Sequence, residues 1–203
     1  MNVKYLQSSE EFMQSDSKNS LVEKFRRIHI FGASGSGVST FGQYLAESWK
    51  IPVFDFDNYY WAESEVPFSI KRNESDRWSL LQKDLSNYSR WIISGHYSNP
   101  PAGFDNKLDL AVFLYVPAEI RLERVRQREA SRYGSRILPG GDMYKIHLDF
   151  IEFCKSYDEN IGHNRTLERH QQRLAKLSCR SVGIAGNLTL AQSLKILEQD
   201  LRG

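Results

Sequence analysis

The stretch Gly32-Ala-Ser-Gly-Ser-Gly-Val-Ser-Thr40 contains most of a phosphate-binding loop of the pattern G-x-x-x-x-G-K-[ST]. Gly32 and Gly37 occupy the two glycine positions, and Ser39 occupies the hydroxyl position. Glycines in such a loop let successive backbone N–H groups converge on a phosphate, and the following helix adds its positive end. The loop residues that we expect to contact a phosphate ligand are Gly32, Ser34, Gly35, Ser36, Gly37, Val38, Ser39 and Thr40.

A glycine- and serine-rich stretch can also be only a flexible turn, because such patterns recur by chance. Here the stretch follows Arg27-Ile-His-Ile-Phe31, which has the composition of a short buried strand. It precedes residues 41–50, in which apolar residues recur at helical spacing. A strand, a glycine-rich loop and a helix in this order are the setting of a phosphate-binding loop, so we favour phosphate binding.

The lysine of the pattern is replaced by Val38. The backbone N–H groups of the loop survive this change, but the point charge at the β- and γ-phosphates is lost. That charge matters most when charge moves in the transition state of phosphoryl transfer. We therefore expect ligand binding to suffer less than catalysis, unless another cation takes the place of the lysine.

Several short apolar runs alternate with helical patterns along the rest of the chain. Parallel strands need crossover connections, and helices supply them on both faces of the sheet. The sequence therefore predicts an α/β fold of three layers, α/β/α, around a parallel sheet of about five strands. The expected strands are residues 27–31, 52–55, 91–94, 110–116 and 180–184.

We expect a polar N-terminal extension over residues 1–24, which are rich in Ser, Glu, Asp and Asn, and one domain over residues 25–203. Two stretches of the domain interrupt the alternation of strands and helices. Residues 58–89 are aromatic and charged, and residues 132–164 carry several hinge-friendly glycines. We interpret the first as an insert that binds an acceptor substrate and the second as a lid.

The composition argues against some classes of partner. Lys and Arg total 27 and Asp and Glu total 25, and the resulting net charge of +2 gives no global attraction to nucleic acid or to an anionic membrane. No apolar run approaches the roughly 18 residues that cross a bilayer, and the start of the chain lacks the apolar segment of a secretory signal. We expect a cytoplasmic protein in which Cys154 and Cys179 are buried thiols.

Asp55 and Asp57 stand at the end of the second expected strand. On an extended strand, residues two apart point to the same face, here near the carboxyl edge where open α/β sheets bind ligands. One carboxylate is suited to hold Mg²⁺, together with the hydroxyl of Ser39, and the other to orient an acceptor hydroxyl. The alternative is an Asx turn formed by Asp57 and Asn58.

Arg124, Arg128 and Arg132 are each four residues apart, so a continuous helix places them on one face. An anion between like charges removes their repulsion, and guanidinium groups match phosphate oxygens. This spacing predicts that a triphosphate lies along the helix. For Arg121 and Arg126 we favour the alternative, a solvated helix with salt bridges to nearby glutamates. Arg165, Arg169 and Arg173 repeat the spacing on a later expected helix, and we expect at least one of them to face the site.

The loop, the segment Phe54-Asp-Phe-Asp57 and the run from Pro117 to Arg128 together resemble the adenylate kinase and shikimate kinase superfamily. More narrowly, the loop with residues 132–137 and 139–143 resembles bacterial proteins described as adenylate-kinase-like or topology-modulation ATPases, which also lack the lysine of the loop. The resemblance covers residues 27–200 as architecture. It implies ATP, or another nucleoside triphosphate, and Mg²⁺ as cofactors.

The resemblance also implies roles for single residues. Asp57 would contact the acceptor and Asp55 would support the metal, as in the D-x-D segment of shikimate and gluconate kinases. Arg128 would contact phosphate and Arg124 would lie beside the base, while Arg132 would close over phosphate from the lid. On this basis the catalytic candidates are Asp57, Arg128 and Arg132, the metal candidates are Ser39 and Asp55, and Arg124 joins the loop as a nucleotide contact.

The chain departs from the superfamily after the third expected strand. Nucleoside-monophosphate kinases usually have an Asp-Gly pair there, whereas this chain has Ser94-Gly95, followed by His96, which we interpret as a loop residue making one hydrogen bond. Asp109 precedes the fourth strand and is interpreted as structural. Two functions remain open: phosphoryl transfer from ATP·Mg²⁺ to a small-molecule acceptor, and a nucleotide-binding switch with little turnover. The sequence leaves the oligomeric state and the acceptor undefined.

Overall fold

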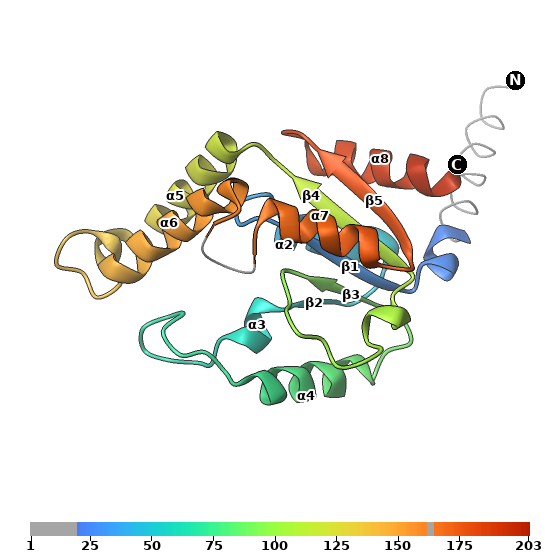
Figure 1. Ribbon diagram of the computed structural model, residues 1–203, viewed down its shortest axis with the longest axis horizontal. Helices are drawn as coiled ribbons and strands as arrows, with labels where there is room; N and C mark the ends of the chain where they lie inside the picture. Colours follow the sequence, from blue (N-terminus) through green and yellow to red (C-terminus); the bar gives the residue numbers. More distant parts are fainter. Residues whose placement is uncertain (1–19, 162–164) are drawn as a thin grey trace, which may run out of the picture.

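The computed structural model describes residues 20–161 and 165–203. Its centre is a sheet of five parallel strands in the order β2-β3-β1-β4-β5, with helices on both faces (Figure 1). The predicted α/β/α architecture with a five-stranded parallel sheet is therefore confirmed. The strands are β1 (Arg27–Gly32), β2 (Val53–Asp55), β3 (Trp91–Ser94), β4 (Leu110–Tyr115) and β5 (Arg180–Ala185).

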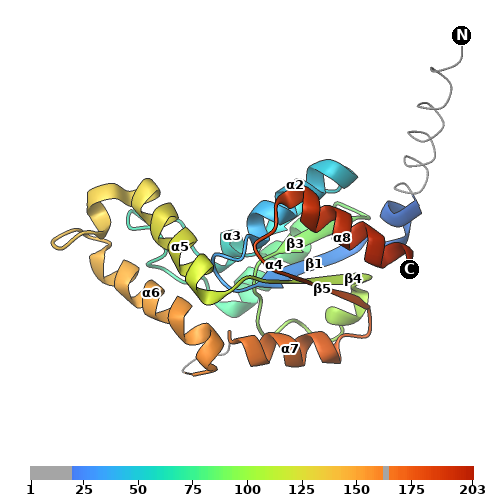
Figure 2. The same ribbon diagram turned by 90° about the horizontal axis from the view of Figure 1, so that it is seen from above.

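The helices divide between the two faces of the sheet, as the view from above shows (Figure 2). Helices α2 (Val38–Trp49) and α8 (Leu190–Arg202) cover one face and contact each other. Helices α4 (Glu74–Leu85) and α7 (Leu167–Lys176) pack on the opposite face. Both faces of the central strands are thus removed from water, which explains why β4 is a continuous apolar run and why β1 is buried at every residue after Arg27.

The register of the sheet places the glycine-rich loop at its carboxyl edge. Gly32, the last residue of β1, is paired with Leu114 near the end of β4. At the opposite edge, the Asp109 carboxylate accepts hydrogen bonds from the backbone N–H groups of Arg26 and Arg27, at 3.1 and 2.9 Å. This confirms that Asp109 is structural and lies away from the loop.

The last part of the expected N-terminal extension belongs to the folded domain. Residues 20–24 are helical, and Leu21 and Val22 are buried in the same core cluster as α2 and α8. Residues 1–19, which make up the rest of that extension, lie outside the described residues, as do residues 162–164 of the expected lid. The folded part of the chain therefore starts before residue 25.

Two groups of elements project beyond the carboxyl edge of the sheet (Figure 1). Helices α5 (Ala118–Tyr133) and α6 (Tyr144–Glu159) pack against each other, with the 3₁₀ helix η2 (Gly134–Ile137) between them in the chain. The short helix α3 (Asp57–Tyr60) and the loop to α4 form the second group, in which Trp61 and Lys71 form an isolated bridge. A further 3₁₀ helix, η1 (Asp105–Lys107), precedes β4.

The two cysteines differ in burial. Cys154 on α6 is buried, as expected, and its burial raises the pKa of the thiol. Cys179, just before β5, is only partly buried, so the expectation of two buried thiols is wrong for this residue. Its position at the start of an edge strand explains the difference, because no further strand from residues 20–161 or 165–203 covers that side of β5.

Candidate nucleotide and acceptor site

The glycine-rich loop has the backbone conformation of an anion-binding loop. Gly35 and Gly37 have φ angles of 81° and 89°, a region that residues with a side chain rarely adopt. A Cβ atom at Gly35 would also lie only 2.4 Å from the carbonyl oxygen of Arg121. The loop therefore needs glycine at this position both for its conformation and for close contact with the start of α5.

The first turn of α2 is open toward a ligand. Its N-cap is Gly37, which has no side chain to accept a hydrogen bond from the helix N–H groups, and Ser39 and Thr40 are exposed. By contrast, the hydroxyl of Ser36 is buried and donates to the carbonyl of Ala33 at 2.7 Å, so it stiffens the loop. Free N–H groups and the positive end of a helix together favour a phosphate at this point.

Val38 does not face the loop opening. Its side chain is 7% exposed and belongs to the core cluster between the sheet and α2. A Cβ atom built at Gly32 would lie 3.2 Å from a methyl group of Val38, so the side chain lies beneath the loop. The position that carries the lysine in the general pattern therefore contributes to packing here, and any cation for the phosphates must come from elsewhere.

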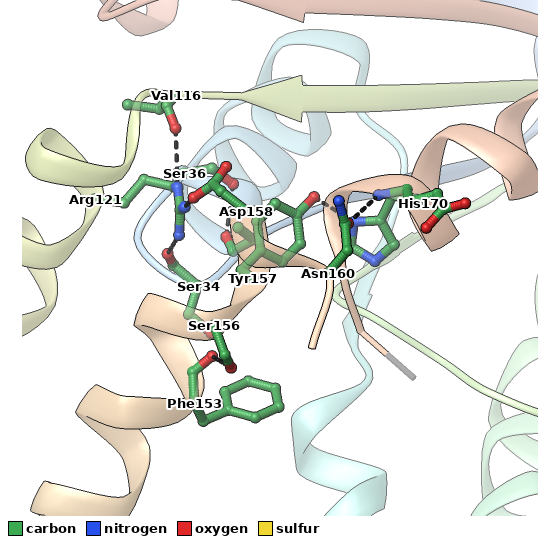
Figure 3. A network of polar contacts seen from close by, with 12 residues as sticks. Ser34, Ser36, Val116, Arg121, Phe153, Ser156, Tyr157, Asp158, Asn160 and His170 are labelled. Carbon is green, nitrogen blue, oxygen red and sulfur yellow. Dashed lines mark hydrogen bonds and ion pairs between the residues drawn. The ribbon is translucent and has the colours of Figure 1, made fainter. Parts of the chain in front are cut away.

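Arg121 is the best buried of the arginines around the loop, with 0% exposure. Its Nε donates to the carbonyl of Val116 at 2.9 Å, and its guanidinium pairs with Asp158 on α6 (Figure 3). It also approaches the carbonyl of Ser34 at 3.5 Å. The expectation of a solvated Arg121 is thus wrong, because the helix periodicity does not reveal that α6 packs across this face of α5.

Arg124 connects the loop with the segment after β5. Its Nη1 donates to the carbonyl of Gly35 at 3.3 Å, and its Nη2 donates to Oδ1 of Asn187 at 2.6 Å. This places Arg124 at the loop, on the side toward β5, where the sequence analysis expected a contact beside the base. Arg126, by contrast, is exposed, as expected for a solvated residue.

Arg128 and Arg132 lie farther along α5, and Arg136 lies on η2. Arg128 is partly exposed, approaches Oε1 of Glu129 at 3.5 Å and lies over the ring of Phe150. Arg132 is exposed on the last turn of α5. Arg136 pairs with Asp142 at 2.6 Å and also approaches the carbonyl of Glu65 at 3.4 Å, so the segment between α5 and α6 contacts the loop that follows α3.

Arg165 reaches the site from a segment far along the chain. Its Nη2 donates to the carbonyl of Gly32 at 3.3 Å, at the base of the phosphate loop, and its charge acts on Asp57 and His96. Arg165 is thus the member of the later arginine series, Arg165, Arg169 and Arg173, that reaches the site, although it precedes α7 rather than lying on it. Arg173 shares its spacing but turns away from the loop, because it forms a bidentate pair with Asp105.

The two aspartates do not share the face of one strand. Strand β2 ends at Asp55, and Asp57 opens α3, so the argument from strand alternation is wrong for Asp57. Oδ1 of Asp55 accepts from the backbone N–H of Asp57 at 3.0 Å, so it is Asp55 that forms the Asx-type contact. Both carboxylates nevertheless stay at the carboxyl edge of β2.

The pKa of the Asp57 carboxyl is raised, first by desolvation and then by the nearby charge of Asp55, while Arg165 and Arg128 lower it. Although its side chain is exposed, the protein around Asp57 still displaces much of the water that would solvate a charge. A carboxylate with a raised pKa is a better proton acceptor than an ordinary surface aspartate.

The oxygen atoms that the protein offers near the loop suit a Mg²⁺ ion that is held jointly by the protein and a nucleotide. Within residues 20–161 and 165–203, no three His, Cys, Asp or Glu side chains gather to form an all-protein metal site. Mg²⁺ usually keeps several waters and takes one or two protein oxygens together with substrate phosphates. The exposed hydroxyl of Ser39 and the carboxylate of Asp55 are oxygen donors of that kind.

Sheet order, phosphate loop and flanking helices together give this chain a P-loop fold that it shares with shikimate kinases. More specifically, the chain belongs to an AAA domain family, AAA_18, which matches residues 28–143. An uncharacterized protein of Bacillus subtilis (strain 168), YqaC, is 40% identical over 154 residues, which are 76% of this chain and 85% of that protein.

Solved structures share the fold at low sequence identity. Shikimate kinase from Acinetobacter baumannii in complex with shikimate is 19% identical, with a TM-score of 0.51 over 91% of this chain and 97% of that chain. Deoxyadenosine kinase from M. mycoides with bound dATP is 14% identical, with a TM-score of 0.51 over 87% of this chain and all of that chain, 100%. No helix among the described residues is long and apolar enough to cross a membrane.

Proposed function

We propose that this protein binds ATP, or another nucleoside triphosphate, with Mg²⁺ and transfers its terminal phosphoryl group to a small-molecule acceptor. The observation that carries this proposal is that the phosphate loop and Asp57 lie at one edge of the sheet. Arg165 donates a hydrogen bond to the loop at Gly32, and its charge lowers the pKa of Asp57. A site for phosphoryl transfer needs an anion cradle, cations for the transferred group and a group that orients the acceptor.

The nucleotide would lie along the loop and the start of α5. The N–H groups of the loop would bind the phosphates, and Arg124, held by Gly35 and Asn187, would lie beside the base. Ser39 and Asp55 would hold Mg²⁺, which neutralises charge on the β- and γ-phosphates when it is bound.

Arginine charge would stand in for the missing lysine. Arg128 and Arg132 extend from the lid helix, and Arg165 lies at the base of the loop. Guanidinium groups bind phosphate oxygens in a bidentate fashion and stay charged, so they are suited to stabilise a transferring phosphoryl group. Because Val38 is packed in the core, these side chains are the cations that the fold offers to the phosphates.

The acceptor would be a hydroxyl metabolite or a nucleotide. Asp57 would orient the acceptor group and take its proton, in keeping with the raised pKa of its carboxyl. Two proteins that share the fold, a shikimate kinase and a deoxyadenosine kinase, are kinases of hydroxyl-bearing small molecules by their names. The insert around α3 and α4 would bind the rest of the acceptor.

The burial of Val38 also favours a second candidate function, a nucleotide-binding switch with little turnover. A loop without its lysine keeps the backbone contacts that bind phosphate but loses transition-state charge. In that case the closing of α5 and α6 over the nucleotide would be the output.

Titration calorimetry of ATP with Mg²⁺, combined with measurement of ADP release, tests the proposal. The samples are wild type, Arg128→Ala and Val38→Lys, with Arg126→Ala as an exposed control on the same helix. We expect wild type to bind ATP, Arg128→Ala to bind at least about tenfold more weakly, as loss of a charge-assisted contact predicts, and the control to match wild type. No binding of ATP by wild type would overturn the proposal.

Release of ADP separates the two candidate functions. A kinase predicts release that depends on an acceptor from a panel of sugar acids, shikimate and nucleoside monophosphates. A switch predicts stoichiometric binding without acceptor-dependent release, in which case phosphoryl transfer as proposed here is wrong. Faster release by Val38→Lys would show that the lost charge limits turnover.

A further inference from the structure

A row of hydrogen bonds links the lid helix α6 to the end of β3. Oη of Tyr157 on α6 and Nδ1 of His170 on α7 are 2.8 Å apart (Figure 3). Nε2 of His170 and Nδ1 of His96, which follows β3, are 2.9 Å apart. Tyr157 and His170 are 3% and 1% exposed, so water does not compete for these bonds.

Both imidazoles are neutral at physiological pH. Burial, followed by the charges of Arg165 and Arg173, lowers the pKa of His170 to about 3. Burial and the charge of Arg165 likewise hold the pKa of His96 well below its usual value of 6.5. A neutral imidazole carries one N–H, so each ring donates from one nitrogen and accepts at the other.

The hydroxyl of Tyr157 decides which nitrogen carries the proton. If His170 donated from Nδ1 to Tyr157, the buried hydroxyl hydrogen would have no acceptor among the residues that the structure describes. Leaving a buried donor without a partner costs about 1–3 kcal/mol. The favoured order is therefore Tyr157 O–H to His170 Nδ1, and His170 Nε2–H to Nδ1 of His96.

This order leaves the proton of His96 on its outer nitrogen, Nε2. The ring is partly exposed, and no hydrogen bond from a described residue engages that nitrogen. Gly95, the preceding residue, lies beside β2, where a Cβ atom would be 3.5 Å from Oδ1 of Asp55. Arg165 acts on both His96 and Asp57, so His96 belongs to the same edge of the sheet as the proposed acceptor site.

We infer that His96 is a further substrate-binding residue, whose Nε2–H donates a hydrogen bond to an oxygen of the acceptor, and that His170 and Tyr157 are positioning residues for it. The inference rests on the proposed function, because it concerns the acceptor side of that site. The acceptor oxygen would accept from His96 while its own proton faces Asp57. A fixed donor of this kind selects alcohol or phosphate oxygens and rejects protonated amines, which have no lone pair to offer.

The test reads the tautomers directly. In the full chain with ¹⁵N-labelled histidine, long-range ¹H–¹⁵N spectra distinguish Nδ1–H from Nε2–H rings. The protein is loaded with Mg²⁺ and a non-hydrolysable β,γ-imido analogue of ATP, so that the γ-phosphate position is filled. Inorganic phosphate is then titrated as the probe of the acceptor site.

We expect neutral Nε2–H forms of His96 and His170, and a saturable shift of the His96 Nε2 signal with phosphate. Tyr157→Phe should give mixed tautomers at both rings and weaker phosphate binding. Tyr59→Phe is the matched control, because it removes a comparable hydroxyl bond of 2.7 Å, to Asp84, outside the row. It should leave both tautomers unchanged, and it serves as the control for the tautomers alone, because Tyr59 lies in the insert proposed to bind the acceptor.

A pair of substitutions separates binding from positioning. His96→Asn keeps a polar group near the δ position but loses the outer donor, whereas His96→Gln places an amide near the ε position. We expect phosphate affinity to fall at least about fivefold in His96→Asn and to be partly restored in His96→Gln, with affinity for the nucleotide analogue unchanged.

Two results would overturn the inference: an Nδ1–H form of His96 in wild type, or equal phosphate responses of wild type and His96→Asn while nucleotide is bound. Failure of wild type to bind the nucleotide analogue would instead overturn the proposed function. The calorimetric and spectroscopic readouts therefore distinguish the two failures.

Discussion

The guanidinium of Arg121 forms an ion pair with Asp158, so the buried start of α5 is tied to the end of α6. The same guanidinium lies 4.9 Å from the ring centre of Tyr157 and approaches the carbonyl of Ser34 in the phosphate loop. One buried cation thereby joins the loop, helices α5 and α6, and Tyr157, the first residue of the row of hydrogen bonds that ends at His96. The contacts of Arg121, and not the loop alone, therefore hold the segments of the site together.

Arg121→Met should lower the free energy of unfolding by about 3–5 kcal/mol, because it leaves the Asp158 carboxylate largely buried without its partner. Urea denaturation followed by circular dichroism measures the change. Arg126→Met, an exposed arginine on the same helix, should change stability by less than about 0.5 kcal/mol. Equal small effects of both substitutions would show that the Arg121 pair contributes nothing to the fold.

Gly35→Ala should abolish tight nucleotide binding, because the new methyl group would lie 2.4 Å from the carbonyl of Arg121 in a backbone region with positive φ. We expect at least about a tenfold loss of ATP affinity and a cost of about 1–3 kcal/mol in stability. Gly183→Ala is the control, since a Cβ atom there would meet nothing within 4 Å. Unchanged ATP affinity in Gly35→Ala would contradict the assignment of the loop.

Asn187→Ala should weaken binding of ATP but not of inorganic triphosphate, because Asn187 holds Arg124 on the proposed base side of the site. Loss of one hydrogen bond to a charged group predicts about a fivefold effect, or roughly 1 kcal/mol. Competition titration with both ligands measures the difference. Equal losses for the two ligands would place Arg124 on the phosphates instead.

The buried histidines should make the protein less stable in mild acid. Burial is the first cause that lowers the pKa of His29, His96 and His170 below the usual 6.5. The unfolded chain gains protons on these rings below about pH 6.5 and the folded chain does not, so stability present above that pH is lost as pH falls. The expected slope well below pH 6.5 is about 1.4 kcal/mol per pH unit for each ring.

Urea denaturation between about pH 7.5 and pH 5 measures this slope in wild type and in His170→Gln. The slope of the unfolding free energy against pH should correspond to about one bound proton fewer in the variant than in wild type, whatever the absolute stability of the variant. Gln172→Ala, which changes an exposed residue of the same helix, should keep the wild-type slope. A His170→Gln slope identical to that of wild type would show that His170 takes up its proton in the folded state.

Much of the architecture could be predicted from local patterns. The strand, the loop with Gly35 and Gly37 and the helix that follows are contiguous in the chain, so periodicity and glycine spacing identify them without tertiary information. The five strands agree with their predicted positions to within about one or two residues, as is usual for element ends. The pattern of the loop also showed that Val38 stands where the general pattern has a lysine.

Most of the failures concern contacts between distant segments, and one concerns the end of a strand. Helical spacing placed Arg121 with the solvated arginines, but α6 packs over it, and the partner Asp158 is 37 residues away. Spacing grouped Arg165 with Arg169 and Arg173, but it could not show that Arg165 is the one that reaches Gly32, 133 residues away. Asp57 was assigned by strand alternation, although β2 ends two residues earlier and α3 begins there.

The sequence by itself determined that this chain forms a parallel α/β sheet with a phosphate loop that lacks its lysine, because glycine conformations and apolar periodicity are properties of neighbouring residues. Only the tertiary structure decided that Val38 is buried, that Arg165 lies at the loop and that Tyr157, His170 and His96 form one row. Burial and hydrogen bonding depend on which distant segments meet, and so do the pKa values and tautomers that follow from them.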